Sequence, residues 1–348
     1  ELDPLLWFDT TYLLEENSHP EAIQVLDEFL TTNAETLIRH PLKRAMFQRD
    51  LWTVFDWLAF QTEPFPVQRE ELKARLTKII KRVALTEEEI LSLPDNYALA
   101  VESKIFPGDF QVDQPQAAFL PSDLFQSNSA WIPIGREGGP IAMSHTNEFP
   151  FLGRSVFLVF VRHPEGRMAT LDFVQSLNSE PQSARTVGID VALVRRMLLI
   201  DDQGELVLSP LIETIQLRHF NPEQIFHEFE LDRRRIINGN ADTFKLKTHL
   251  FMLFFSHGDV FERDHGPELQ ATIPNICKAC HLNDPPLPNY GNTQSIISVS
   301  RSNFPLPNKE APILRPISWP DEVQLVIEWK HNHNTWQTLE TLWSQETP

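Results

Sequence analysis

Cysteine is almost absent from this chain, which has two in 348 residues. This number excludes a scaffold built on disulfides, because such folds use several cysteines in a short chain. Long apolar runs are absent too, since the two best, SVFLVFV and HLFMLFF, have only the length of a strand. No membrane span is therefore predicted.

Basic residues and glycines are also scarce. Lys and Arg number 30 against 48 Asp and Glu, which gives a formal net charge of −18. Binding to nucleic acid or to an anionic membrane surface depends on concentrated positive charge, so neither partner is expected. An acidic surface is, however, able to steer a basic redox partner. The 27 prolines against 12 glycines indicate stiff, ordered connections rather than flexible linkers.

The first hundred residues have apolar side chains at helical spacing. Pro20 suits the first turn of a helix, and His40-Pro41 interrupts the pattern that follows it. Thr86-x-x-Glu89 is a capping box, which marks the start of another helix. Helices are predicted from Pro20 toward residue 40, over 43–60, after Pro66, from Thr86 to near Pro94, and over NYALAVESK.

From about residue 106 the pattern changes to short apolar runs. SVFLVFVRH predicts a buried strand, RMATLDFVQSL a helix, and VALVRRMLLI with ELVLSPLIETIQLRHF two strands joined by a turn at Asp201–Gly204. DDQGE is interpreted as this turn rather than as a calcium site. FHEFELDRRRII and KTHLFMLFFSH continue the strand pattern. These segments predict a mostly antiparallel sheet with at least one helix, over residues 106–258.

The remainder contains both cysteines, a proline-rich meander from NDPPLPNY to APILRPISWP, and a predicted terminal helix at 320–344. Proline withholds a backbone donor, so the meander cannot continue a helix or lie inside a sheet. The expected fold class is α+β. The expected domains are a helical one at 1–105, a mostly β one at 106–258, and a cysteine-bearing segment at 259–348 that packs on the β domain.

The two cysteines stand three positions apart, and a histidine follows the second: Cys277-x-x-Cys280-His281. This pattern is typical of covalent attachment of haem c. One helical turn brings both thiols to the two vinyl groups on one porphyrin edge and places the next histidine beneath the iron. Two thioether bonds and an imidazole ligand are therefore predicted here.

The segment CKACH resembles the attachment site of the c-type cytochromes, and the resemblance is confined to these five residues. It implies one covalent haem c with His281 as the proximal iron ligand. It also implies attachment outside the cytoplasmic membrane of a bacterium, hence a periplasmic or otherwise exported protein. The chain begins at Glu1 without methionine, which agrees with a mature form after removal of a signal and equally with a trimmed sequence.

Three other interpretations of the cysteine pair stay open. A thioredoxin-like dithiol needs a βαβ setting, whereas a proline-rich meander follows here. A zinc site needs a fourth ligand, and no second C-x-x-C or H-x-x-x-H supplies one. A local disulfide leaves the adjacent histidine unexplained.

The sixth ligand of the iron is not given by the motif. All five methionines precede Cys277, so a domain that runs from the motif to the C-terminus has no axial methionine. His257 and His265, each followed by glycine, are the leading candidates for a distal ligand. His331 and His333 on the terminal helix come next, and then His145, His163 and His249. Further candidates for contact with the haem are Arg233, Arg234 and Arg235 at its propionates and Tyr290 at its edge.

Two functions from different classes follow. The first is an exported monohaem redox protein that transfers electrons to a partner protein. The second is a haem c enzyme or small-ligand sensor with an open distal site, in a cytochrome P460-like or peroxidase-like layout. Cytochrome P460-like proteins also place C-x-x-C-H late, after a β-sheet, but their crosslinking lysine matches no position here. A haem that only stabilises a binding module is a third hypothesis.

Overall fold

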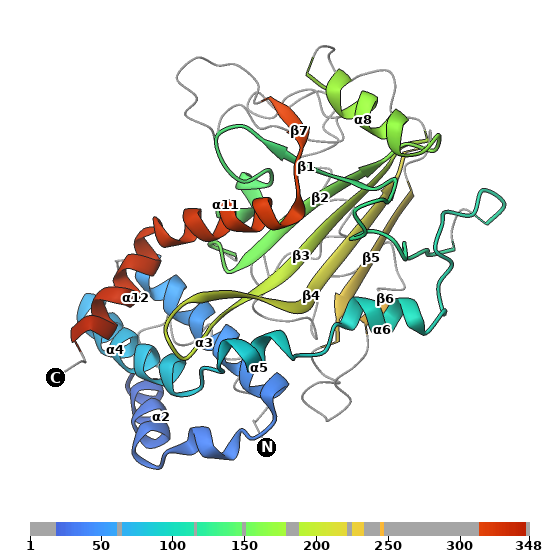
Figure 1. Cartoon of the computed structure of the whole chain (residues 1–348). Coiled ribbons are helices and arrows are strands. Elements are labelled where there is room, and N and C mark those ends of the chain that lie inside the picture. Colours follow the sequence, from blue (N-terminus) through green and yellow to red (C-terminus); the bar gives the residue numbers. More distant parts are fainter. Residues whose placement is uncertain are drawn as a thin grey trace.

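The computed structural model describes residues 19–60, 65–114, 117–147, 151–178, 188–220, 225–232, 244–246 and 313–345 (Figure 1). N-terminal helices lie at one end of a central antiparallel sheet, which confirms the α+β class. The helices are α2 His19–Thr31, the 3-10 helix η2 Ala34–Leu37, α3 Pro41–Phe60, α4 Pro66–Arg82, α5 Glu87–Leu91, α6 Asn96–Glu102, α7 Met143–Asn147, α8 Arg167–Ser176, α11 Trp319–His331 and α12 Asn334–Gln345. The strands are β1 Ile132–Arg136, β2 Ser155–Arg162, β3 Asp190–Ile200, β4 Leu206–His219, β5 Ile225–Leu231, β6 Phe244–Leu246 and β7 Leu314–Pro316.

The N-terminal helices follow the predicted pattern closely. The capping box is present, since Glu89 N donates to Thr86 Oγ1 and Thr86 N donates to the Glu89 carboxylate. The first helix ends at Thr31, earlier than predicted. The reason is local: Asn33 adopts a left-handed conformation with φ of 52°, and a 3-10 turn replaces the last predicted turns.

The sheet has the strand order β6-β5-β4-β3-β2-β1-β7, and every neighbouring pair is antiparallel. β3 and β4 form the predicted hairpin. Its turn is held by Asp201, whose carboxylate accepts from Gln203 N and Glu205 N, and by Gly204 at φ of 91°. The turn interpretation of DDQGE is thus confirmed. KTHLFMLFFSH lies outside the described residues, and so does the proline-rich meander up to residue 312.

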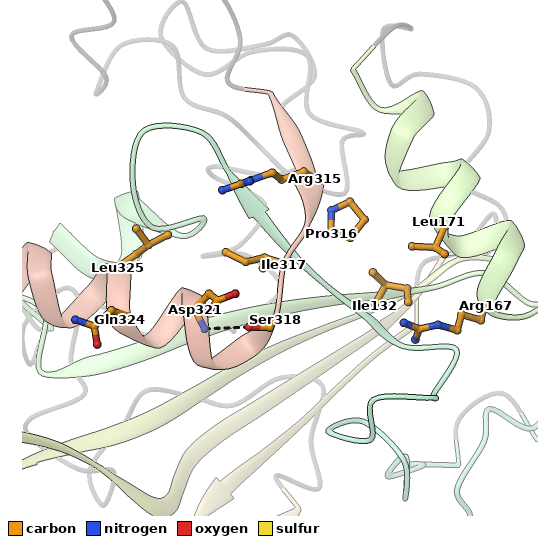
Figure 2. Close-up of a pocket in the computed structure, with 10 residues that line it drawn as sticks. All are labelled: Ile132, Arg167, Leu171, Arg315, Pro316, Ile317, Ser318, Asp321, Gln324 and Leu325. Atoms are coloured by element: carbon orange, nitrogen blue, oxygen red, sulfur yellow. Dashed lines mark hydrogen bonds between the residues drawn. The ribbon is translucent and has the colours of Figure 1, made fainter.

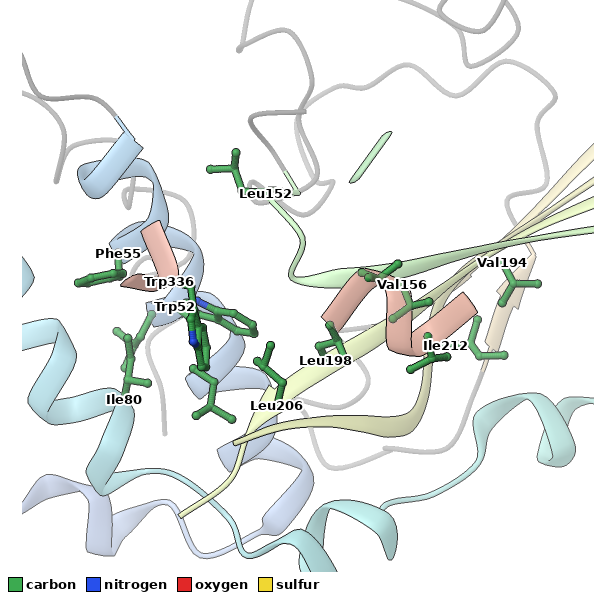
Figure 3. Close-up of a cluster of buried hydrophobic side chains, with 14 of the residues drawn as sticks. Trp52, Phe55, Ile80, Leu152, Val156, Val194, Leu198, Leu206, Ile212 and Trp336 are labelled. Carbon is green, nitrogen blue, oxygen red and sulfur yellow. The ribbon is translucent and has the colours of Figure 1, made fainter. Parts of the chain in front are cut away.

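One face of the sheet, called face A here, is apolar and covered by helices. Residues directly opposite each other in an antiparallel pair lie on the same face, so the register assigns each side chain. Face A carries Leu158, Phe160, Val194, Ile215 and Leu217. They belong to one core with side chains of α3, α4, α11 and α12, part of which is seen in Figure 3.

The opposite face, called face B, changes character along the strand order. On β2 it carries the apolar Phe157, Val159 and Val161. On β3 it combines Val191 and Leu193 with Arg195, and on β4 and β5 it becomes polar, with the side chains Thr214, Gln216, Arg218, Glu228 and Glu230. The principal contacts of α7 and α8 are with β1, β2 and β7, and the second core cluster of this side joins Phe157 and Val161 to Val174 of α8.

The C-terminal region contains two helices where one was predicted. α11 ends at His331 and α12 begins at Asn334, because His333 Nδ1 accepts from Thr335 N and interrupts the first helix. α11 lies along face A, while α12 packs against α3 and α4 through contacts such as Trp336 with Trp52. One core thus joins the described parts of all three segments, and the boundaries near 105 and 258 stay a prediction. None of the helices in the described ranges combines the length and hydropathy needed to cross a bilayer.

Candidate functional site

The residues predicted to hold the haem lie outside the described part of the chain. They are Cys277, Cys280 and His281, with the distal candidates His257 and His265. The same holds for His249, Arg233, Arg234, Arg235 and Tyr290. The predicted haem contacts of all these residues therefore stay predictions.

The two histidines of the C-terminal helices are engaged in local structure. His333 Nδ1 lies 3.0 Å from Thr335 Oγ1, and its ring packs on Trp329 with centroids 4.8 Å apart. Burial, and then the nearby Lys330 ammonium, lower the pKa of His333 to about 4. The ring of His331 lies 5.4 Å from that of Trp336. Both imidazoles thus have packing partners at the helix junction.

His145 has a different environment, on face B of the sheet. It lies on α7, and its ring stacks on Phe157 of β2 with centroids 5.4 Å apart. Phe157 also contacts Phe151 edge to face at 5.0 Å, and the Arg195 guanidinium lies 5.1 Å above the Phe151 ring. With Arg218, whose charge acts on the imidazole, these residues form a group that we name the arginine–aromatic cluster.

The electrostatics of the arginine–aromatic cluster keep His145 neutral. Burial lowers its pKa most, and the positive charges of Arg218 and Arg195 lower it further, to about 4. The cluster is therefore a packed arrangement of a neutral imidazole, two aromatic rings and two guanidinium groups.

A second polar group is sealed inside the protein. Asp56 Oδ2 accepts from Arg154 at 2.7 Å and from Lys330 at 2.6 Å, and all three side chains have 0% exposure. Lys330 Nζ also donates to Leu152 O at 2.9 Å and to Thr335 Oγ1 at 3.0 Å. Burial alone would raise the pKa of Asp56, but the two cations outweigh it and hold this pKa below its usual value. This ion cluster joins α3, the residue that precedes β2, and α11, and its complete burial leaves no access for a substrate.

Another buried group continues from the ion cluster along α3. Arg49 donates to Ser155 Oγ at 2.9 Å and lies 3.4 Å from Glu213 Oε1. Arg195 approaches the same carboxylate at 3.5 Å, so the end of the arginine–aromatic cluster is tied to the interior. Glu213 stands where β3 and β4 shift register. The bulge therefore places a carboxylate between two arginines.

A cavity of about 470 Å³ lies between α8, β7 and α11 (Figure 2). Arg167 and Arg315 stand on its wall, with Ser318 and Asp321 at the start of α11. Arg167 Nη1 donates to Ser129 O at 2.6 Å, and Asp321 N donates to Ser318 Oγ at 3.3 Å. The lining has charges of both signs and apolar side chains, and it does not converge on one ligand chemistry.

Comparison with known proteins gives no family. No family model, curated protein or solved structure matches this chain. Within the described ranges, no group of three or more His, Cys, Asp or Glu side chains is arranged to hold a metal ion.

Only a weak signal in the amino-acid sequence points to the arginine–aromatic cluster. His145 was a remote candidate for the distal ligand, and Arg195 and Arg218 were not predicted to contribute. The available signal is the pair Arg195 and Arg196 inside the apolar strand VALVRRMLLI, because consecutive strand residues point to opposite faces. In a buried strand, two adjacent arginines therefore point to opposite faces of the sheet, so each face receives one guanidinium group.

Proposed function

We propose that this chain is an exported monohaem c-type cytochrome that acts in electron transfer. Haem c is attached through Cys277 and Cys280, and His281 is the proximal ligand. The observation that carries the proposal is the sequence Cys277-x-x-Cys280-His281, which uses the only cysteines of the chain. When bound, the haem supplies a one-electron Fe(III)/Fe(II) couple.

The residues present fit such a group. Two thiols and an imidazole are the donors that covalent haem attachment requires, and they stand at the required spacing. The formal net charge of −18 favours a basic redox partner, whose approach an acidic surface accelerates.

An open distal site is the second candidate function. It is favoured by the position of the methionines, since Met252 is the last of them and stands before Cys277. An iron without a sixth protein ligand binds small molecules, which suits an enzyme or a sensor in a cytochrome P460-like or peroxidase-like layout. The large sheet then contributes the walls of a distal pocket.

The test is expression with an export signal in a host that has a cytochrome c maturation system. The expected product is red and keeps its haem on a denaturing gel, while the variant Cys277→Ala, Cys280→Ala carries none. A colourless wild-type product with bound zinc contradicts the proposal. The reduced absorption spectrum with and without carbon monoxide then separates the two functions, because only an open iron takes up the gas.

A further inference from the structure

The loop that joins β1 to α7, residues 137–142, is fastened to the first turn of α11 by a single side chain. Glu322 Oε1 accepts from Ile141 N at 2.6 Å. The Ile141 side chain packs in the same core cluster as Phe157 and Val174, with 8% exposure. We call residues 137–142 the α7 loop. Its contact with Glu322 joins two parts of the chain that are far apart in sequence.

The carboxyl group that makes this contact is sealed and only half satisfied. Glu322 has 1% exposure, and its Oε2 has no hydrogen-bond partner within the described ranges. An ionised carboxylate accepts up to about four hydrogen bonds, and burying its charge without them is costly. A protonated carboxyl keeps the bond from Ile141 N through its carbonyl oxygen and carries no charge. The docked α7 loop therefore favours the protonated form of Glu322.

One cation acts against this preference. Burial raises the pKa of Glu322 to about 7, although the bond from Ile141 N and the positive charge of Arg136 both act to lower it. Arg136 ends β1 and has 5% exposure. The other ionisable residues of the α7 loop, of the first turn of α11 and of the elements packed on α11 are exposed or held in ion pairs of their own: Glu137, Asp321, Arg162 and Glu340.

The α7 loop has a hinge between β1 and its contact with α11. Gly138 and Gly139 have φ of 83° and 132°, a backbone region that glycine adopts without strain. Between this hinge and Ile141, Pro140 O accepts from Arg136 Nε at 2.8 Å. Rotation about the two glycines thus separates residues 140–142 from α11 at the cost of few contacts, while the strands of the sheet stay paired.

We propose that Glu322 and the α7 loop form a pH-sensitive latch, which is closed while the carboxyl is protonated and releases the loop from α11 when it ionises. The latch needs no haem, so it stands independently of the proposed function. Loss of the proton is harder in the closed latch, where the pKa of Glu322 is about 7, than in the hydrated open state, where it returns to 4.5. The equilibrium constant for opening is therefore lowest below pH 4.5, rises up to about tenfold per pH unit, and levels off above pH 7 after a rise of about 300-fold.

The test is hydrogen exchange of the Ile141 amide in the full chain, because this N–H is the donor of the latch. Protection factors from NMR between pH 4.5 and 8 remove the intrinsic pH dependence of exchange. For wild type we expect the protection of Ile141 to fall about 300-fold over this range, and for Glu322→Gln we expect it to stay constant. Asp321→Asn is the matched control, because it removes an exposed carboxyl from the same helical turn, and it should keep the wild-type profile. Since the opening is local, Ile141 should also be less protected than the buried strand amide of Val194 and insensitive to low urea concentrations.

Two results overturn the latch. Parallel pH profiles of Ile141 in wild type and in Glu322→Gln show that ionisation of Glu322 does not release the loop. An Ile141 amide with the same protection and the same urea dependence as Val194 shows that it exchanges only through global unfolding. If Glu322→Gln does not accumulate, wild type and Asp321→Asn decide: a shared fall in protection that levels off above pH 7 supports the latch, and a flat or rising profile overturns it.

Discussion

The two faces of the sheet are formed by the same strands, yet their chemistry differs. Face A is apolar along β2, β3 and β4 and is closed by helices from both ends of the chain. Face B is apolar at β2, mixed at β3 and polar at β4 and β5, where some of the polar side chains are buried. Buried apolar surface is the usual source of stability, whereas buried charge is costly unless it has partners. The difference indicates that face A supplies most of the apolar core of the described residues.

Breaking the buried ion cluster of Asp56, Arg154 and Lys330 should have the largest effect on stability. Asp56→Ala leaves Arg154 and Lys330 buried without their shared carboxylate. We expect a loss of about 4 kcal/mol in the free energy of unfolding, measured by urea unfolding followed by circular dichroism. Asp27→Ala is the control, because it breaks an ion pair with Arg75 in which the Asp27 side chain is 49% exposed. Its expected loss is below about 1 kcal/mol, and equal losses for both variants contradict this account.

A pair of leucine truncations compares the two faces directly. Leu158 lies in the core of face A with 1% exposure, whereas Leu193 lies on face B and is half-buried. We expect Leu158→Ala to cost about 3 kcal/mol and Leu193→Ala about 1 kcal/mol in urea unfolding. If Leu193→Ala costs more than Leu158→Ala, face B carries a larger share of the core than inferred here.

A buried carboxylate ties the two sides together in a pH-dependent way. Glu322 of α11 accepts from Ile141 N at 2.6 Å, and Ile141 belongs to the core cluster of face B. Burial raises the pKa of Glu322 to about 7, from 4.5. The folded chain therefore keeps this proton at pH values where the unfolded chain has lost it. The contribution to stability is complete below pH 4.5 and is lost as the pH rises through about 7.

The variant Glu322→Gln keeps an oxygen acceptor for Ile141 N and has no proton to lose. Compared with it, wild type should lose on the order of 3 kcal/mol between pH 4.5 and 8, measured as urea unfolding at several pH values. Parallel pH profiles for the two proteins would show that Glu322 does not titrate in this range.

Two glycine substitutions separate backbone strain from close packing, with the smallest expected difference. Gly153 has φ of 72°, and an added Cβ would lie 2.5 Å from the Trp329 ring of α11. Gly138 has φ of 83°, but a Cβ there meets nothing within 4 Å. Gly138→Ala should cost about 1 kcal/mol through the backbone alone. Gly153→Ala should cost about 1 to 2 kcal/mol more, because the β2 end packs tightly on α11. Thermal unfolding of the two variants measures the difference.

Local patterns in the sequence predicted most of the fold. Apolar spacing located the helices, Thr86 and Glu89 marked a helix start, and Asp201 to Gly204 marked the β3–β4 turn. The junction at His333 was missed, because α11 and α12 have no proline or glycine between them and separate through a side-chain hydrogen bond. Signals within a few residues were therefore sufficient to predict the helices and the turn, but they did not predict the junction between α11 and α12.

The same distinction between short-range and long-range signals applies to the candidate site. Cys277, Cys280 and His281 stand together in the sequence, so their predicted chemistry needs no knowledge of the fold. The arginine–aromatic cluster combines α7, β2, β3 and β4, and the register of these strands sets which side chains stand near His145. Sheet register and connection path set these contacts, and neither is encoded in a short motif.

The central claim is covalent attachment of one haem to the cysteine pair. Its most direct test is the intact mass of the denatured protein after export in a host with a cytochrome c maturation system, for wild type and for Cys277→Ala, Cys280→Ala. We predict that wild type exceeds the mass of its own chain by one haem and that the double variant has the mass of its chain alone. A wild-type chain without added mass, with both thiols free or joined to each other, would contradict the claim.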